Sequence, residues 1–361
     1  MAKRHTLLVA CIISASNFSQ VKAQTTLSGD HIITGKLDVG SSGTPGGITV
    51  AGQTGNIAAP GIKVTGDGGV VFMGTLGIGQ IPAVGAGTRF MWYPRKGALR
   101  AGEFSSWQLD DLFIGVGSVA FTRSSADGTY STAMSGGSAR GEYSTAMSNS
   151  EATGEFSTGM SRGSAFGSGS TAMGMGIAVG EYSTAMSFGY TEGNYSTAMT
   201  YGSAYDFGST AMSGGEAFAP DSIAMSGGAT YEINATAMSR GVAFGIRSTA
   251  MTEGYAFGTG TTAMSGGVAV GGYSTAIGNG ASAASFNSVA VGRYNSITGS
   301  ENAGAWVPTD PLFVIGNGTG DYENHPPEVA SHNALIVYKN GKIKMDRQGD
   351  ILMGEFGNSE Q

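Results

Sequence analysis

The chain has 361 residues and a formal net charge of −7 at pH 7; 62 residues are glycine and 12% are charged, about half of the usual share. The glycines follow no Gly-X-Y period, which excludes collagen and favours a thin, turn-dense architecture. Lysine is absent from Gly97 to Tyr338, so no basic stripe is available to bind nucleic acid.

Residues 1–23 have the pattern of an export signal. Lys3 and Arg4 precede the short apolar run TLLVACIISA (residues 6–15), and VKA (21–23) offers a small-residue cleavage site. The alternative is a lipoprotein box, LVAC (8–11), although the apolar run ahead of Cys11 is very short. Both predict a secreted or bacterial cell-surface protein. Cys11 is the only cysteine, so we expect no disulfide, and no later apolar run is long enough for a membrane-spanning helix.

Two segments of different composition follow the signal. Residues 24–86 alternate β-branched residues with glycine turns, as in GITVAG, GIKVTG and GVVFMG, which predicts a β-rich shaft. Residues 87–117 hold two of the three tryptophans. Because a repeat array exposes unpaired strand edges at its ends, we expect this second segment to be a cap.

Residues 118–300 consist of a repeat built on the motif STAM. Each copy follows the previous one by 13 residues, except for the last, which follows by 14; the copies begin at Ser118, Ser131, Ser144, Ser157, Ser170, Ser183, Ser196, Ser209, Ser222, Ala235, Ser248, Thr261, Ser274 and Ser288. The glycines in every unit exclude a helix. Two short strands and two turns per unit predict an all-β parallel β-solenoid, with one unit per coil.

Residues within a unit are numbered from position 0, the first residue of the motif. Position 2 is alanine in thirteen units and Gly159 in one, so we expect it to face the narrow interior of the coil. Position 3 faces the other way and holds Met134, Met147, Met160, Met173, Met186, Met199, Met212, Met225, Met238, Met251 and Met264.

The methionine column stands beside a column that is mostly threonine, at position 1. This uniform face contrasts with variable outward positions on the second strand, such as Arg140, Glu151 and Tyr190. An apolar stripe of this length predicts burial against other chains, and we expect a homotrimer. In the alternative, the opposite face points inward and methionine fills the chain's own core.

Aromatic residues alternate between two positions near the second turn. Each of the twelve units from Ser118 to Thr261 has one aromatic, either at position 12 or at position 9. Tyr130, Tyr143, Phe156, Tyr182, Tyr195 and Tyr273 are at position 12, and Phe166, Tyr205, Phe218, Tyr231, Phe244 and Phe257 are at position 9. This pattern predicts either one shared packing slot per coil or an exposed aromatic ladder that contacts a ligand.

The unit NSVAVG (287–292), with the 14-residue step before it, resembles the head repeat of YadA-type trimeric autotransporter adhesins; the earlier units are similar, with a shorter turn. The resemblance covers residues 118–300. It implies a left-handed parallel β-roll, three chains wide, that presents an adhesive surface to an extracellular protein, a glycan or another surface ligand. Adhesins of this family end in a membrane-anchor barrel, whereas this chain ends in ILMGEFGNSEQ, which predicts that the anchor is absent.

Residues 301–361 are expected to form a second cap or neck and a foot. AWVPTDPLFVIGNG (305–318) follows the last coil and is expected to cap it. NALIVYKNGKIKM (333–345) resembles β-segments near the ends of phage tail fibres and predicts a separate trimeric foot.

Motifs for chemistry are weak. His31, His325 and His332 lack metal-ligand spacing, and GNGTGD (316–321) reads as a plain turn rather than a calcium loop. No nucleophile, base and metal set converges, so we expect no enzyme and no cofactor. The alternative to an adhesin is an ice-binding or purely structural solenoid that uses the threonine column, which Val119, Ile223 and Val289 interrupt.

Overall fold

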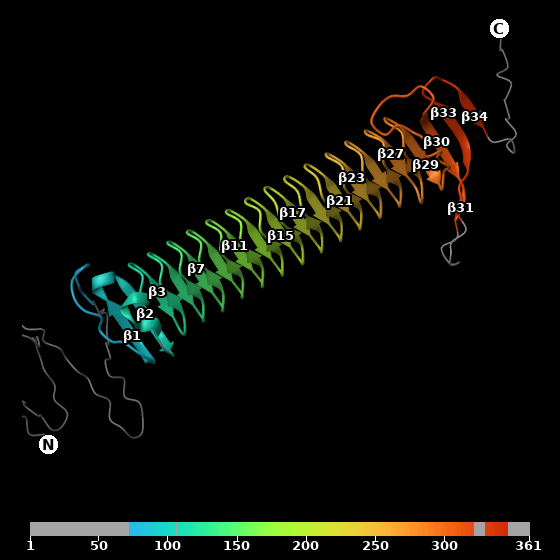
Figure 1. Cartoon of the computed structure of the whole chain (residues 1–361). Helices are drawn as coiled ribbons and strands as arrows, with labels where there is room; N and C mark the ends of the chain where they lie inside the picture. The colour runs from blue at the N-terminus through green and yellow to red at the C-terminus, as the bar shows by residue number, and fades with distance from the viewer. Residues whose placement is uncertain (1–71, 106, 321–328, 346–361) are drawn as a thin grey trace, which may run out of the picture. The chain divides into compact units, whose positions relative to one another are not determined.

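A computed structural model describes residues 72–105, 107–320 and 329–345 of the chain. The predicted signal and most of the predicted shaft lie outside these residues. Figure 1 shows the unit that begins at Phe72 as a long stack of coils with a small folded end at each side. The predicted β-solenoid is confirmed.

Each coil contributes one strand to each of two parallel sheets, so the sheets run along the stack. The first sheet contains β3 (Val119–Phe121), β5 (Thr132–Met134), β7 (Thr145–Met147), β9 (Thr158–Met160), β11 (Thr171–Met173), β13 (Thr184–Met186), β15 (Thr197–Met199), β17 (Thr210–Met212), β19 (Ile223–Met225), β21 (Thr236–Met238), β23 (Thr249–Met251), β25 (Thr262–Met264), β27 (Thr275–Ile277) and β29 (Val289–Arg293).

The second sheet has two residues per coil. It contains β4 (Ser125–Ala126), β6 (Ser138–Ala139), β8 (Glu151–Ala152), β10 (Ser164–Ala165), β12 (Ile177–Ala178), β14 (Tyr190–Thr191), β16 (Ser203–Ala204), β18 (Glu216–Ala217), β20 (Ala229–Thr230), β22 (Val242–Ala243), β24 (Tyr255–Ala256), β26 (Val268–Ala269) and β28 (Ser282–Ala283).

The register of the coils follows the sequence period. Met173, Met186 and Met199 are direct partners in successive strands, and the alanines beside them pair in the same way. The one 14-residue step is absorbed at the first turn, where Val268 pairs with Ser282 and the ladder then continues in phase. Equivalent residues therefore stand above one another along the whole repeat.

The core is a narrow column of small side chains. The alanines at positions 2 and 8 are almost all fully buried, and the serines at position 0 are buried as well. Several of these serines donate to a carbonyl three residues earlier and close the second turn; Ser157 Oγ, for example, lies 2.6 Å from Gly154 O. A Cβ built on Gly189 would lie 2.2 Å from Ala198 O, so the coil leaves no space for a larger side chain there.

The turns use left-handed backbone that is held by the stack. Ser187 and Phe188 in a first turn have φ of 51° and 65°, and Tyr182 in a second turn has φ of 53°. The Tyr182 N–H donates to Ser168 O of the preceding coil at 2.8 Å, and the turn N–H groups of Ser187 and Phe188 do the same toward their preceding coil. Hydrogen bonds between coils thus keep non-glycine residues in a conformation that is otherwise unfavourable.

The N-terminal end of the stack is a hairpin with three short 3-10 helices. Strands β1 (Gly87–Tyr93) and β2 (Ala98–Phe104) are antiparallel, and β2 pairs in parallel with β3, so the hairpin extends the first sheet. The helices are η1 (Pro94–Lys96), η2 (Trp107–Leu109) and η3 (Asp111–Phe113). This is the segment for which the sequence predicts a cap.

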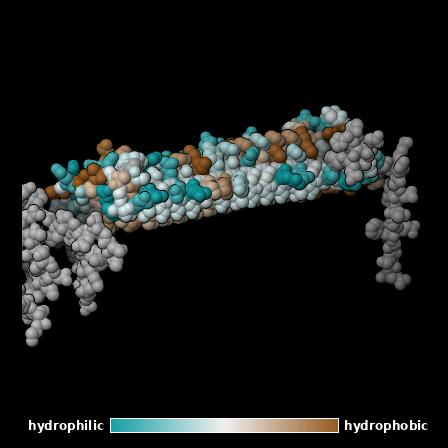
Figure 2. Space-filling view, turned by 90° about the horizontal axis from the view of Figure 1, so that it is seen from below, coloured by the Kyte–Doolittle hydropathy of each residue, from teal (hydrophilic) through white to brown (hydrophobic). Residues whose placement is uncertain are grey.

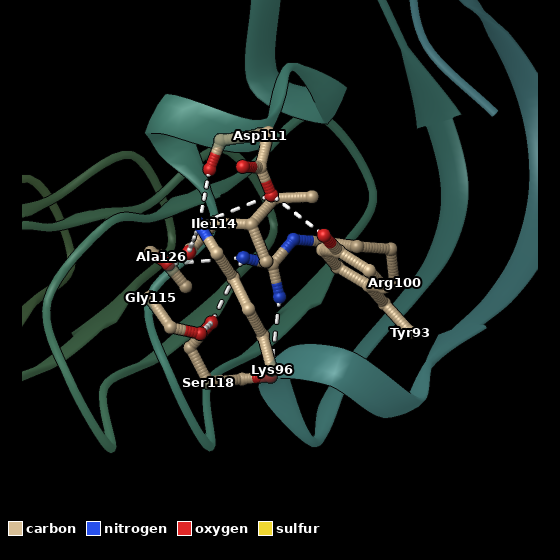
Figure 3. Close-up of polar contacts among 8 residues, drawn as sticks. All are labelled: Tyr93, Lys96, Arg100, Asp111, Ile114, Gly115, Ser118 and Ala126. Carbon is tan, nitrogen blue, oxygen red and sulfur yellow. Dashed lines mark hydrogen bonds and ion pairs between the residues drawn. The ribbon is translucent and has the colours of Figure 1, made fainter. Parts of the chain in front are cut away.

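Arg100 fills the end of the coil interior, where it stands beside Ala120 in the register (Figure 3). The side chain is fully buried and donates to Ser118 O at 3.1 Å, to Ser118 Oγ at 2.9 Å and to Ala126 O at 3.0 Å. Burial lowers the pKa of Arg100 to about 10, and the charge of Asp127 opposes this shift. Ser118 O and Ala126 O also accept from the backbone N–H groups of Leu99 and Gly115, so the guanidinium adds a second donor to each of these carbonyls.

The C-terminal end corrects one prediction. Strand β30 (Pro311–Asn317) pairs in parallel with β29, β33 (Asn333–Tyr338) is antiparallel to β30, and β34 (Ile343–Met345) is antiparallel to β33. The expected separate foot is therefore part of the same sheet as the coils. Strands β31 (Thr319–Gly320) and β32 (Val329–Ala330) form a small sheet of their own.

The predicted shaft is also corrected where the structure describes it. Residues 72–86 contain turns and bends but no strand; β1 is the first strand after them.

Candidate binding surface

The Met–Thr face, formed by positions 1 and 3 of the first sheet, points outward. The alanines at position 2 are buried, whereas the threonine before and the methionine after each of them are only half-buried in most coils. The alternative in which methionine fills the chain's own core is therefore wrong. The face runs along the stack in register, as the pairing of Thr184 with Thr197 and of Met186 with Met199 shows. Its burial against other chains stays a prediction.

The aromatic residues of the second turn do not share one slot. Position-12 rings stack on position-12 rings of neighbouring coils, as in Tyr130–Tyr143 and Tyr182–Tyr195, both at 5.2 Å between centroids. Position-9 rings stack on position-9 rings. No ring contact joins the two positions in the described part of the chain, so the prediction of a shared slot is wrong, and nothing in the structure explains the alternation.

All of these rings are exposed, except Tyr205, which is half-buried. Tyr143 and Phe156 stack at 5.0 Å and are 46% and 57% exposed. Tyr273 instead meets Phe286 edge-on at 5.7 Å, and Phe166, which is 41% exposed, stands between coils that have Thr153 and Val179 at its position. The sequence prediction of an exposed aromatic ladder thus describes the geometry, while its contact with a ligand stays a prediction.

The longest uninterrupted stack is at position 9 in the C-terminal half of the repeat. Its centroid spacings run from 4.7 to 5.1 Å with interplanar angles of 1° to 14°, and its five rings are Tyr205, Phe218, Tyr231, Phe244 and Phe257. We call this stack the ring ladder. Because the rings cover each other's faces, the ladder presents a row of ring edges to solvent.

Position 11, two residues after each ring of the ladder in sequence, carries a second apolar column. Phe207 is 51% exposed, Ile233 is 43% exposed and Ile246 is 42% exposed. Pro220, in the coil between those of Phe207 and Ile233, is half-buried. We call the ring ladder and this column the apolar patch. Figure 2 shows apolar side chains gathered along one edge of the stack, next to a paler and more even surface.

In the N-terminal half of the repeat, position 11 is polar in every coil, and position 9 is polar in all coils except the two with Phe166 and Val179. Glu142, Glu155 and Glu181 occupy position 11 there, and Arg140 and Glu192 occupy position 9. Arg140 pairs with Glu151 of the next coil at 2.8 Å, and Tyr190, which leans on Tyr205 at 5.9 Å, has its pKa raised by burial and by the neighbouring Glu192. The two columns therefore change from mostly polar to mostly apolar at Tyr205.

The apolar patch is the feature that the sequence reading missed. Alignment of the units shows the rings at position 9. The alternation of aromatics involves positions 9 and 12 and gives no information about position 11. Reading position 11 down the same alignment would have found Phe207, Pro220, Ile233 and Ile246 in four successive units.

Sites for catalysis or metals are not apparent among the described residues. No three His, Cys, Asp or Glu side chains lie close enough to share a metal ion within them, and none of their helices is long and apolar enough to cross a bilayer. A cleft of about 610 Å³ near β33 and β34 is lined by residues including His332, Asn333 and Lys344, and His332 Nδ1 lies 2.6 Å from Asn317 Oδ1. His31, His325 and Asp321 lie outside the described residues.

No protein-family model matches the sequence, and no curated protein does. The resemblance to YadA-type heads therefore rests on the repeat residues themselves.

Proposed function

We propose that this protein is a non-enzymatic, adhesin-like fibre, exported to the bacterial surface or beyond it, in which a rigid homotrimer of β-solenoids presents a binding surface. The observation that carries the proposal is the division of the solenoid into one uniform outward face and several variable ones. The Met–Thr face has methionine in eleven successive coils and threonine in ten of them, whereas the second sheet and turns change from coil to coil.

The uniform face suits contact between copies of the chain. Its methionine column extends over about 50 Å if the coils are about 4.8 Å apart, which is long for an apolar stripe in water. The Met–Thr face is straight and has nearly the same residues in each coil, so two copies can contact each other in the same way at every coil. A closed symmetric bundle therefore buries this face along its whole length.

The variable faces suit recognition of a ligand. A trimer that buries its Met–Thr faces leaves the second sheet and its turns in solvent, and exposed residues carried by a rigid scaffold are common binding surfaces. The ligand class is an extracellular protein or a glycan, because the surface is short of cationic groups for nucleic acid.

The test is binding of the purified chain to immobilised extracellular-matrix proteins and to a glycan array. We expect saturable binding to at least one of them. The matched control is a chain in which Glu142, Glu155 and Glu181 are changed to Gln, which alters the variable face and leaves the Met–Thr face intact. Absence of binding to every probe, together with a monomeric mass, would contradict the proposal.

A second candidate, ice binding, is favoured by the registered threonine column alone. Thr184, Thr197 and Thr210 are direct partners in neighbouring strands, but Ile223 follows them. Thermal hysteresis of the purified chain decides between the candidates. Hysteresis that disappears when these three threonines are replaced by leucine would favour ice binding over the fibre.

A further inference from the structure

The apolar patch is confined to five successive coils. A partner that covers it should therefore contact the solenoid over the same length. Stacking alone does not require the patch, because the coils of the N-terminal half have the same backbone, and none of them has apolar residues at both positions 9 and 11. The rings of the ladder already cover one another, so what the patch offers is a row of exposed edges and aliphatic side chains at one interval per coil.

The spacing of the patch selects among possible occupants. An α-helix laid along it would rise about 5.4 Å per turn against about 4.8 Å per coil, and would fall out of step by roughly 2.4 Å over the four intervals of the ring ladder. A second solenoid of the same chain has the same interval at every coil. A copy of this chain is therefore the partner whose side chains stay in step along the entire patch.

Charges beside the patch select the orientation of that copy. Asp221 and Arg247 are both exposed, both occupy position 12, and lie one coil before and one coil after the coil of Tyr231. Neither takes part in an ion pair among the described residues. If two copies meet face to face and antiparallel, with a two-fold axis at the level of Tyr231, each Asp221 stands opposite the partner's Arg247.

A parallel arrangement lacks this match. With a two-fold axis along the stack, the coils of the two copies meet at equal heights, so position 12 of one copy is no longer opposite position 12 of the other, and Asp221 and Arg247 find no complementary charge. Only the antiparallel pair makes both the apolar patch and its flanking charges self-complementary.

We propose that the apolar patch binds the apolar patch of a second copy of this chain, antiparallel and about a two-fold axis at the coil of Tyr231. This contact is separate from the Met–Thr face and does not rest on the proposed trimer, since the patch lies on the second turn and is exposed in a single chain.

The size of the patch makes the contact weak. Five coils by about 10 Å of width bury on the order of 500–800 Å² from the two copies together, below the roughly 1,200 Å² at which standard complexes begin. Glu232 lies in the coil on the two-fold axis, so the Glu232 carboxylates of the two copies come close to each other. Their repulsion opposes association. We expect a dissociation constant on the order of 100 µM for a single pair, which multivalent display on a surface would strengthen.

Cysteine cross-linking traps such a weak pair and reads its register. In a Cys11→Ser background, Ile233→Cys places a thiol on the axis, where it meets its own copy. Ile246→Cys is the matched control, because its exposure is almost equal, 42% against 43%, but it stands two coils, about 9.6 Å, from its copy. Adding Pro220→Cys to Ile246→Cys restores a facing pair.

Under mild oxidation of the purified full chain, we expect the Ile233→Cys chain and the Pro220→Cys/Ile246→Cys chain to form disulfide dimers at least tenfold faster than the Ile246→Cys chain. Equal rates for all three, or no dimer in any, would overturn the proposal and leave the patch to a partner of another kind. Faster dimerisation of Ala229→Cys/Ile233→Cys than of Ile233→Cys would show parallel pairing and would also overturn it.

Charge reversal supplies an independent test on the same dimers. In the Ile233→Cys chain, Asp221→Arg and Arg247→Asp should each slow dimerisation about tenfold, and the two together should restore the rate, because the facing charges are opposite again. Failure of the double reversal to rescue would contradict the antiparallel register. The sedimenting mass of the chain before oxidation reports separately on the trimer, so loss of one contact is distinguishable from loss of the other.

Discussion

Gly159→Ala should destabilise the protein although it restores the residue that every other unit has at position 2. In a typical coil, glycine at position 6 faces alanine at position 2 of the next coil; a Cβ added to Gly189 would lie 2.2 Å from Ala198 O. At Gly159 the arrangement is reversed. Ser150 occupies position 6, and its Oγ donates to Gly159 O at 2.7 Å and accepts from Met147 N at 2.7 Å.

The size of the effect follows from the space around Gly159. An added Cβ would lie 2.6 Å from Glu151 O and 3.2 Å from Glu151 C, and these backbone atoms cannot move independently of β8. Overpacking of this kind costs about 1–3 kcal/mol, less up to about 1 kcal/mol that alanine gains over glycine in the unfolded chain. The first coil tolerates Ser124 with Ala133, where Ser124 Oγ bonds to Phe121 O at 2.6 Å, so the strain can be partly relieved. We expect a net loss of about 1–2 kcal/mol.

The assay is a double-mutant cycle in urea, followed by far-UV circular dichroism. Ser150→Gly alone should lose about 1 kcal/mol with its two hydrogen bonds. Ser150→Gly with Gly159→Ala recreates the common pair and should return to within about 0.5 kcal/mol of the wild type, because contacting residues are not additive. A stabilising Gly159→Ala, or additive losses in the double variant, would refute the reasoning about packing between coils.

Three further predictions test the cap and the Met–Thr face. Arg100→Ala should lower the midpoint of thermal unfolding by several degrees, since it leaves a cavity and removes the hydrogen bonds of Arg100 to Ser118 and Ala126, whereas Arg100→Lys should recover part of the loss; calorimetry measures both. Met186→Asp should dissociate the proposed trimer in sedimentation velocity, whereas Glu192→Asp on the variable face should leave the mass unchanged. The pKa of Asp111 is lowered from its ordinary 3.8, first by the hydrogen bond from the Tyr93 hydroxyl. This stabilisation is present above that value and is lost as the pH falls through the lowered pKa, so amide protection of the cap should drop there, and Tyr93→Phe should reduce the drop.

The coil and its inward face could be predicted because the period and the alanine column constrain each other. A 13-residue step repeated in phase requires equivalent residues to stack, and a column as small as Ala185 and Ala198 requires a close backbone neighbour. The same alternation then places methionine outside. These inferences need only the sequence, since every coil repeats the same local environment.

The aromatic arrangement could not be predicted in the same way, because its contacts run between coils rather than within one. Tyr182 and Val179 belong to one coil, but Tyr182 stacks on Tyr195 of the next. The alternation of positions 9 and 12 predicts a contact within a coil, whereas the rings stack between coils.

The two ends of the stack depend on tertiary contacts that leave little trace in sequence. Arg100 in ALRAGEF looks like an exposed strand residue, and its hydrogen bonds to Ser118 and Ala126 of the first coil offset the cost of its burial. At the other end, the return of lysine and larger apolar residues predicted a separate foot. The pairing of β33 with β30 instead joins that segment to the coils.

Sedimentation equilibrium of the purified full chain at low micromolar concentration tests most directly the central claim that the Met–Thr face joins copies into one fibre. The antiparallel contact of the apolar patch is not populated at this concentration, so the mass reports on the Met–Thr face alone. The account predicts three times the mass of one chain, and one chain mass for Met186→Asp. A wild-type chain that sediments as a monomer, with the same mass as Met186→Asp, would contradict it.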